Sequence, residues 1–484
     1  MRRDRLVETV AERQVPAWWR DAQFGIFVHW TPASVPGFAP TDQDIGELLA
    51  RRHPAAFAWS PYTEWYENSL RFAGSPVARH HAEHHAGEPY ASFAPRYEAA
   101  LAHWEPAAWA QSFAAAGARY VVLVAKHHDG WCLWPSEVPN PNRPGWAARR
   151  DVVGELADAV RGAGLKFGLY YSGGLDWTFN AHPIGRFSDL LAAQPTGDYA
   201  AYAEAQVREL IDRYRPSVLW NDISWPTPKP RLARLLADYY DAVPDGVVND
   251  RFMPRSALWQ LGSLRPARWL IDSAVARAAN QERGLVPPKP PLFDVRTPEY
   301  TSFDHVQSNP WESVRGMDKS FGFNRKSTEA DFLTKSELLW SFADIVAKGG
   351  NLLLNVGPRG EDAQIPAPQR RRLEWMAHFM DGGGSALRGT RPWRVPAADT
   401  IDAEVRYASN DGDLIVVARA RDDGSSVSRL LLTDVVLATG SVTEAGRLLT
   451  WTFGDTGTTV ELVRPLDHVV PTVLVVKGVR PAAG

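Results

Sequence analysis

A short apolar run that ends on a carboxylate is the stretch of this sequence best suited to carry chemistry. Residues 218–220 are strand-forming, and Asp222 stands at the C-terminal end of the run. An Asp in this place ordinarily caps the following helix. Three prolines between residues 226 and 230 oppose a prompt helix start. A functional carboxylate is therefore the better interpretation of Asp222.

Other polar side chains follow the apolar runs in the same way. They are His29, His127, His128 and Arg251. A lone His at the end of a strand is more often structural than catalytic. Together with Asp222, however, these residues predict an active site, because the C-terminal ends of the strands build the site in parallel barrels.

The sequence does not predict a metal or cofactor site. His127 and His128 are adjacent, so on a strand they would point to opposite faces and make poor joint ligands. The histidine-rich run 80–85 lacks His-Glu-x-x-His spacing and is interpreted as a solvated loop. Glycine-rich phosphate loops and the Gly-x-Ser-x-Gly elbow are also missing. What remains is carboxylate chemistry in a pocket lined by Trp and His, which suits glycoside hydrolysis.

Alternating strand and helix patterns over about 370 residues position these side chains. Strands are expected at 24–30, 120–126, 166–172, 218–220, 247–251 and 351–357, with weaker candidates at 293–300 and 311–316. Thr334 and Glu337 form a capping box that begins a helix. About eight strands predict an α/β fold of the (β/α)8-like (TIM) barrel type. Residues 253–293 fit this repeat poorly and are interpreted as an insertion.

The pattern changes after three consecutive glycines at 382–384. Short strand-like runs separated by turn residues then predict a C-terminal all-β sandwich. The expected division is a catalytic domain at 1–385 and a sandwich domain at 386–484.

Composition limits the classes of binding partner and the cellular location that we expect. The 484 residues carry a formal net charge of −3, so neither nucleic acid nor an acidic membrane surface is an expected partner. The single cysteine, Cys132, rules out an internal disulfide framework. No signal peptide and no apolar run long enough to span a membrane are seen, so the expected location is cytoplasmic.

Several motifs together resemble the α-L-fucosidases of glycoside hydrolase family 29. The resemblance runs from about residue 15 to 380. It rests on residues 24–30, 64–66, 126–130, 150–151, 168–172, 219–222, 249–251, 299–300, 311–312, 320–324 and 349–358.

The resemblance implies a retaining exo-α-L-fucosidase that works by double displacement. It assigns Asp222 as the nucleophile and Glu299 as the acid/base, with Glu64 as the runner-up for that second role. It also carries a set of residues onto the sugar pocket: His29, Glu64, Trp65, His127, His128, Tyr170, Trp220 and Arg251. The implied partner is a small carbohydrate with a terminal α-L-fucoside, no cofactor is implied, and a homo-oligomer is allowed.

Two alternatives stay open at the level of sequence. One is a non-hydrolytic fucose-binding protein, against which the presence of both candidate acids counts. The other is a related hydrolase acting on α-L-galactosides, because an apolar pocket rejects one added hydroxyl only weakly.

Overall fold

A parallel β-sheet forms the larger part of the computed structural model, which describes residues 7–8, 10–255, 264–281, 286, 288–421, 426–433, 435–437 and 439–481. Within these residues seven parallel strands share one sheet in the order β5-β4-β3-β2-β1-β7-β6. The strands are β1 (Phe24–Val28), β2 (Tyr120–Lys126), β3 (Lys166–Tyr171), β4 (Val218–Asn221), β5 (Val247–Val248), β6 (Trp311–Arg315) and β7 (Gly350–Val356).

Residues 294–300 close this sheet into a barrel. Val295 pairs in parallel with Asn249 after β5, and Glu299 pairs in parallel with Val314 of β6. The Val295 amide donates to Val248 O at 3.2 Å, and the Tyr300 amide donates to Val314 O at 2.9 Å. The weak strand predicted at 293–300 is therefore the segment that joins the two edges of the sheet. We call it the 294–300 stave. This confirms a (β/α)8-like barrel, with Glu299 at the C-terminal end of the joining stave.

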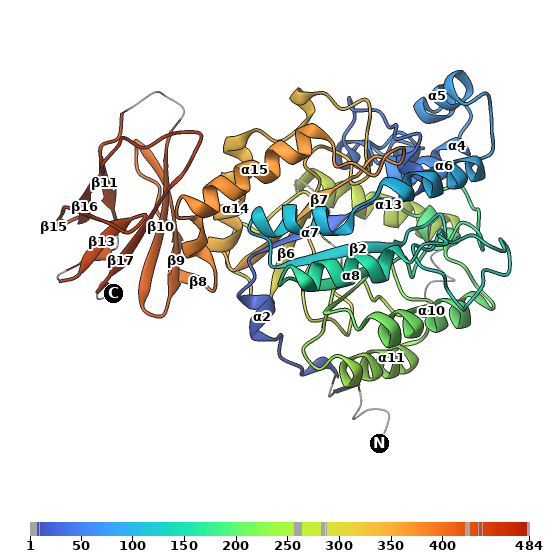
Figure 1. Cartoon of the computed structure of the whole chain (residues 1–484), viewed down its shortest axis with the longest axis horizontal. Helices are drawn as coiled ribbons and strands as arrows, with labels where there is room; N and C mark the ends of the chain where they lie inside the picture. The colour runs from blue at the N-terminus through green and yellow to red at the C-terminus, as the bar shows by residue number, and fades with distance from the viewer. Residues whose placement is uncertain are drawn as a thin grey trace.

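Helices surround the sheet (Figure 1). They are α2 (Ala17–Arg20), α3 (Ile45–Ala50), α4 (Tyr66–Leu70), α5 (Pro76–His84), α6 (Phe93–Ala100), α7 (Pro106–Ala115), α8 (Val152–Gly162), α9 (Asp189–Ala193), α10 (Tyr199–Tyr214), α11 (Lys229–Ala242), α13 (Arg265–Gln281), α14 (Lys335–Ala347) and α15 (Ala367–Asp381). The predicted capping box is present at the start of α14, where Thr334 Oγ1 accepts from the Glu337 amide at 3.2 Å.

The strands are buried on both faces, which explains their nearly continuous apolar sequences. Alternate residues such as Phe27, Tyr170 and Trp220 fill the inside of the barrel. Their neighbours along the strands, such as Ile26 and Leu219, pack outward against the helices. Gly25 leaves the space that the Tyr120 ring occupies, since a Cβ there would lie 2.3 Å from that ring.

The C-terminal strands form antiparallel sheets that lie to the left in Figure 1, as the sandwich prediction requires. They are β8 (Arg391–Ala397), β9 (Ala403–Asn410), β10 (Asp413–Ala420), β11 (Arg429–Leu432), β12 (Val435–Val436), β13 (Ser441–Glu444), β14 (Arg447–Leu449), β15 (Trp451–Gly454), β16 (Gly457–Glu461), β17 (Thr472–Lys477) and β18 (Arg480–Pro481). The sequence did not predict β8, an edge strand whose prolines at 392 and 396 weaken the strand signal.

Two predicted elements differ in the structure. The fifth strand was expected over 247–251, but β5 contains only two residues, because Asn249 uses its side chain to bond the backbone of Asn221. The segment 253–293 contains the helix α13, while its residues 256–263, 282–285 and 287 lie outside the described part of the chain.

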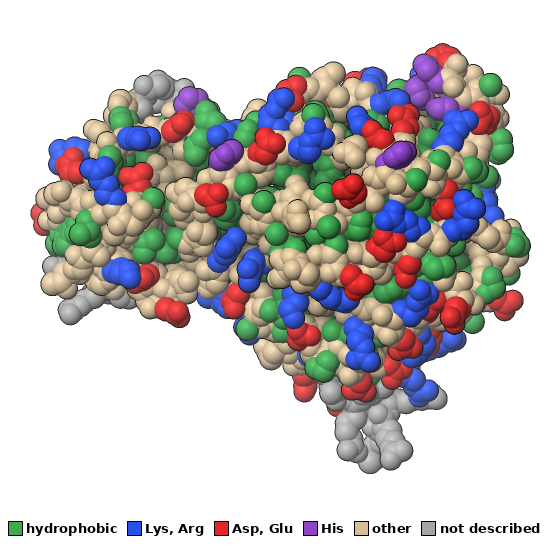
Figure 2. All heavy atoms as spheres, viewed as in Figure 1, with side chains coloured by type: hydrophobic (Ala, Val, Ile, Leu, Met, Phe, Trp, Pro, Cys, Tyr) green, Lys and Arg blue, Asp and Glu red, His purple; other side chains and the backbone are tan. Residues whose placement is uncertain are grey.

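Charges of both signs are interspersed over the face shown in Figure 2, in keeping with the small net charge. No helix within the described residues combines the length and the apolar character needed to cross a membrane.

Candidate active site

A pocket of about 170 Å³ opens where the barrel strands end. Nine of the ten predicted site residues line it: His29, Glu64, Trp65, His127, Tyr170, Trp220, Asp222, Arg251 and Glu299. They reach it from the C-terminal ends of β1, β2, β3, β4 and β5 or the residues just after them, from the 294–300 stave and from the 3-10 turn at Thr63–Trp65. Closure of the barrel thus brings residues that are far apart in the sequence into one site.

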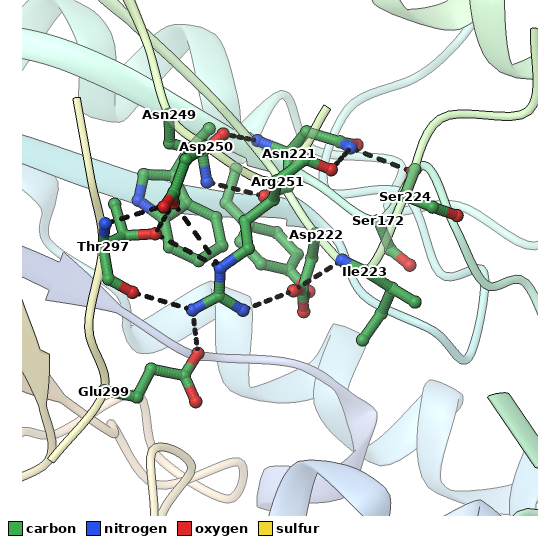
Figure 3. A network of polar contacts seen from close by, with 12 residues as sticks. Ser172, Asn221, Asp222, Ile223, Ser224, Asn249, Asp250, Arg251, Thr297 and Glu299 are labelled. Carbon is green, nitrogen blue, oxygen red and sulfur yellow. Dashed lines mark hydrogen bonds and ion pairs between the residues drawn. The ribbon is translucent and has the colours of Figure 1, made fainter. Parts of the chain in front are cut away.

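Arg251 joins the two principal carboxylates (Figure 3). Its Nη1 donates to Asp222 Oδ1 at 3.2 Å, and its Nη2 donates to Glu299 Oε1 at 2.8 Å. Nη2 also donates to the carbonyl oxygen of Thr297 at 3.0 Å. One planar guanidinium therefore fixes both acids relative to each other.

A side-chain network holds this group in place (Figure 3). The backbone amide of Asn221 donates to Asn249 Oδ1 at 2.9 Å, and Asn249 Nδ2 donates to the backbone carbonyl oxygen of Asn221 at 2.8 Å. Asp250 accepts from the amide of Thr297 at 3.1 Å and from its hydroxyl at 2.5 Å. These bonds tie the ends of β4 and β5 to the closing stave, so the two acids are set by three neighbouring staves.

The backbone is left-handed directly after each carboxylate. Ile223 has φ of 65° and Tyr300 has φ of 52°. This conformation is unfavourable for a β-branched residue such as Ile and is typical of functional sites. At Ile223 it lets the amide donate to Asp222 Oδ1 at 2.8 Å. The Tyr170 hydroxyl donates to the other oxygen, Oδ2, at 2.8 Å.

The surroundings of Glu299 favour its protonated form. Burial raises its pKa, the Arg251 charge lowers it and the Asp222 charge raises it, with a net rise. For Arg251, burial lowers the pKa, but Glu299 and Asp222 outweigh this and the net shift is upward. Arg251 is therefore a permanent cation between the two acids.

Glu64 is a second buried acid in the pocket wall. Burial raises its pKa to about 7, against the opposing effect of the Gly322 amide. That amide donates to Glu64 Oε2 at 3.0 Å. A pKa near neutrality suits either a proton donor or a hydrogen-bonding group, so Glu64 keeps its place as the runner-up.

The three histidines of the site are neutral groups, and of these three only His29 and His128 have a side-chain hydrogen-bond partner among the described residues. His29 Nδ1 lies 2.6 Å from Asn355 Oδ1, which leaves Nε2 as an acceptor in the pocket wall. Burial lowers the pKa of His29 to about 4 and that of His128 to about 4, and it also lowers the pKa of His127 well below its usual value. Neutral imidazoles bind hydroxyl groups without adding charge.

His128 is the predicted site residue that lies behind the pocket wall. Its Nδ1 is 2.6 Å from Ser172 Oγ, and its Nε2 is 3.8 Å from Asp222 Oδ2. The expectation that His127 and His128 point to opposite faces was wrong, since their ring centres are 4.0 Å apart. β2 ends at Lys126, so the strand alternation no longer applies to them.

The histidine run at 80–85 does not form the predicted loop. It lies largely within α5, which begins at Pro76, directly after the N-cap Ser75. Purple side chains gather on the surface at the upper right of Figure 2, where Figure 1 shows α5, although His81 of the run is buried. Among the described residues no three His, Cys, Asp or Glu side chains are grouped so that they could hold a metal ion.

Sequence reasoning did not identify several residues of the wall: Phe27, Phe57, Tyr62, Phe187, Leu190, Ile223, Val286, Pro288, Val314 and Phe321. Tyr62 and Phe321 come from loops far apart in the sequence, and their rings are in contact, with centres 5.8 Å apart. Phe27 and Phe321 lie in motifs that the sequence pointed out, at 24–30 and 320–324, whereas nothing local distinguishes Tyr62 from a core aromatic.

Comparison with known proteins gives one consistent result. The family model described as alpha-L-fucosidase matches residues 4–385. The chain is 31% identical to an α-L-fucosidase of Branchiostoma floridae over 85% of this chain and 80% of that protein. It is 30% identical to the tissue α-L-fucosidase of Homo sapiens over 79% of this chain and 71% of the human protein.

Solved structures agree. The α-fucosidase of Thermotoga maritima in complex with a mechanism-based inhibitor superposes with a TM-score of 0.79 at 35% identity, covering 97% of this chain and 98% of that one. The same enzyme in complex with fucose gives a TM-score of 0.78 at 34% identity, with 97% and 98% covered. The similarity thus includes the C-terminal strands as well as the barrel.

Proposed function

The chain belongs to the α-L-fucosidase family of glycoside hydrolases, and we propose from this that its pocket removes a terminal α-L-fucose by double displacement. Asp222 attacks the anomeric carbon and forms a fucosyl-enzyme ester while Glu299 gives a proton to the departing oxygen. Glu299 then takes a proton from water, which attacks the ester and releases fucose with retained configuration.

The bridge from Arg251 to both acids is the observation that carries this proposal. Retaining glycosidases keep their two carboxyl groups about 5–5.5 Å apart. Asp222 and Glu299 bond neighbouring nitrogens of the same guanidinium, which supports a pair of carboxyl groups that act on one glycosidic bond. The raised pKa of Glu299 suits an acid, and the contacts of Asp222 with Arg251 and Tyr170 aim its carboxylate for attack.

Two polar atoms in the pocket wall that lack a hydrogen-bond partner among the described residues support sugar binding. They are His127 Nδ1 and the Tyr62 hydroxyl, and both are buried. A buried polar group without a partner is costly, so each is placed to bond a ligand hydroxyl. Trp65 and Phe321 add apolar faces that suit the ring and methyl group of fucose.

Hydrolysis of 4-nitrophenyl α-L-fucoside by the wild type and by Asp222→Gly tests the proposal. The wild type is expected to be active, and the variant to lose activity by a factor on the order of a thousand or more. Added azide should restore turnover in the variant and give β-fucosyl azide, because the small anion enters the space of the missing carboxylate. A structure of Thermotoga maritima α-L-fucosynthase, named for an Asp-to-Gly variant, contains a β-L-fucosyl azide unit, which supports this expectation.

Three results would contradict the proposal. Near-normal activity of Asp222→Gly would remove Asp222 as the nucleophile. Tight fucose binding without turnover by the wild type would favour the non-hydrolytic alternative. A higher kcat/KM on 4-nitrophenyl α-L-galactoside than on the fucoside would show that the preferred sugar is L-galactose. This comparison is needed because an apolar pocket rejects one extra hydroxyl by roughly a hundredfold at most. Cytoplasmic location and homo-oligomer formation stay predictions.

A further inference from the structure

A second cavity of about 480 Å³ adjoins the catalytic pocket. Phe187 lines both spaces and forms a shared wall. The second cavity lies between the end of α3, the chain at Arg186–Asp189 and the helix α13. Its lining consists of Leu49, Arg52, His53, Arg186, Phe187, Ser188, Asp189, Arg268, Trp269, Asp272 and Val275. A volume in this range is typical of small-molecule sites.

The polar part of this cavity is held by hydrogen bonds. Ser188 donates to Asp272 from its amide and from its hydroxyl, both at 2.9 Å. Asp189 accepts from the Gly185 amide at 3.0 Å and from Arg268. The carboxylates and guanidinium are thus fixed before any ligand arrives, as preorganised recognition of hydroxyl groups requires.

Trp269 provides an exposed aromatic face on the same cavity. Its side chain is 61% exposed, and the Arg52 guanidinium lies 5.7 Å from its ring centre. An exposed aromatic ring at the edge of a cavity with fixed polar groups offers a contact surface for the ring of a ligand. The flat face of Trp matches the apolar face of a sugar ring, while Asp272 and Arg268 can bond hydroxyls at the edge of that ring.

We infer that this cavity binds the sugar residues to which the fucose is attached, with Trp269 as the stacking platform. The inference rests on the proposed function, because the shared Phe187 wall is what connects the cavity to the reaction. A fucosylated oligosaccharide would then lie with its fucose in the catalytic pocket and its next residues against α13. The enzyme would prefer such substrates to simple aryl fucosides.

The test measures kcat and KM of wild type and Trp269→Ala on 4-nitrophenyl α-L-fucoside and on a panel of fucosyllactoses and fucosylated N-acetyllactosamines of different linkages. On the oligosaccharide that wild type cleaves best, the variant should lose about tenfold in kcat/KM, mainly through KM, as expected for one aromatic contact. On the aryl fucoside the change should stay within about twofold. Trp269→Phe should retain most of the oligosaccharide activity.

Leu270→Ala is the matched control, because Leu270 is the next residue of α13, is equally exposed at 61% and does not line the cavity. It should leave both substrates unaffected. Calorimetric titration with lactose and N-acetyllactosamine, which lack fucose, measures binding to the second cavity independently of hydrolysis. Wild type should bind one of these sugars, and Trp269→Ala should bind neither. Binding that depends on Trp269 in a protein inactive on every fucoside would support the cavity and refute the proposed function. Equal losses on both substrate types, or no binding of either sugar by wild type, would overturn the inference.

Discussion

Arg251 gives the two acids their different environments. Both accept from the same guanidinium, yet Glu299 bonds it through one oxygen at 2.8 Å, whereas Asp222 also accepts from Tyr170 and from its neighbouring amide. Asp222 is thereby held in one orientation, and Glu299 keeps an oxygen for proton transfer. Two carboxyl groups in unlike environments are the usual basis for separate acid and nucleophile roles.

Replacing Glu299 by Gln should show whether Glu299 or Glu64 is the acid/base. A sugar leaving group needs protonation and 4-nitrophenolate does not, so kcat on an oligosaccharide should fall on the order of a hundredfold or more. The first step on the aryl fucoside should be far less affected. Activity in wild type should fall at alkaline pH as Glu299 loses its proton, and this limb should vanish in Glu299→Gln. Steady-state kinetics over a pH series provide the measurement.

Glu64→Gln serves as the comparison, because Glu64 lines the same pocket and its pKa is also raised, to about 7. As a binding residue, it should affect both substrate types in parallel. If Glu64→Gln rather than Glu299→Gln produced the leaving-group dependence and removed the alkaline limb, the two roles would be exchanged.

At the scale of elements, Glu312 connects three barrel strands inside the core. It belongs to β6 and is fully buried. It accepts from the Tyr120 hydroxyl of β2 at 2.8 Å and from Trp220 Nε1 of β4 at 3.1 Å. The Trp220 ring stacks on Tyr170 at 5.3 Å. This buried acid therefore supports the floor of the pocket from below.

Glu312 should make stability depend on pH. Burial raises its pKa from 4.5 to about 7, so its stabilising contribution is complete below the unfolded pKa and is lost as pH rises through 7. Relative to Glu312→Gln, the free energy of unfolding of wild type should fall by up to about 3 kcal/mol across this range. The variant should also be less stable at low pH by about 1–3 kcal/mol, because Gln can accept from only one of the two donors through its carbonyl. Urea unfolding between pH 5 and pH 8 measures both effects.

Glu374→Gln, on the exposed face of α15, is the control and should follow the wild-type pH dependence. Identical slopes for wild type and Glu312→Gln would show that Glu312 titrates normally in the folded protein.

At the scale of the whole molecule, α14 joins the barrel to the C-terminal sheets. The ring centre of Trp340 in α14 lies 4.8 Å from the guanidinium of Arg406 and 4.4 Å from that of Arg419. Arg406 also donates to Asp344 of the same helix at 2.6 Å. The pocket residues all fall between Phe27 and Phe321, so this contact is structural and separate from the site.

Trp340→Ala should therefore lower stability without changing catalysis. Removal of a buried Trp costs about 3 kcal/mol or more. kcat/KM on the aryl fucoside should stay unchanged at temperatures where the variant is folded. Denaturant unfolding, followed together with activity, checks both statements. Leu448→Ala, 71% exposed on β14, should change neither. A loss of kcat/KM that parallels the loss of stability would mean that the C-terminal sheets shape the pocket.

The sequence by itself determined what depends on local patterns. Apolar runs separated by helical periods predicted the barrel strands, the Thr334 capping box predicted the start of α14, and the end of the 218–220 run pointed to Asp222. Each of these signals is a short-range preference of the backbone and of burial, so it can be read without knowledge of partners distant in the chain.

Tertiary structure decided how the site is completed. Glu299 has no strong local signal and reaches Arg251, 48 residues earlier, only because the 294–300 stave pairs with both β5 and β6. Tyr62 enters the wall from a loop, and the cavity beside Trp269 exists only where α13 approaches α3. Contacts between distant segments follow from barrel closure and packing, which leave no period in the sequence to reveal them.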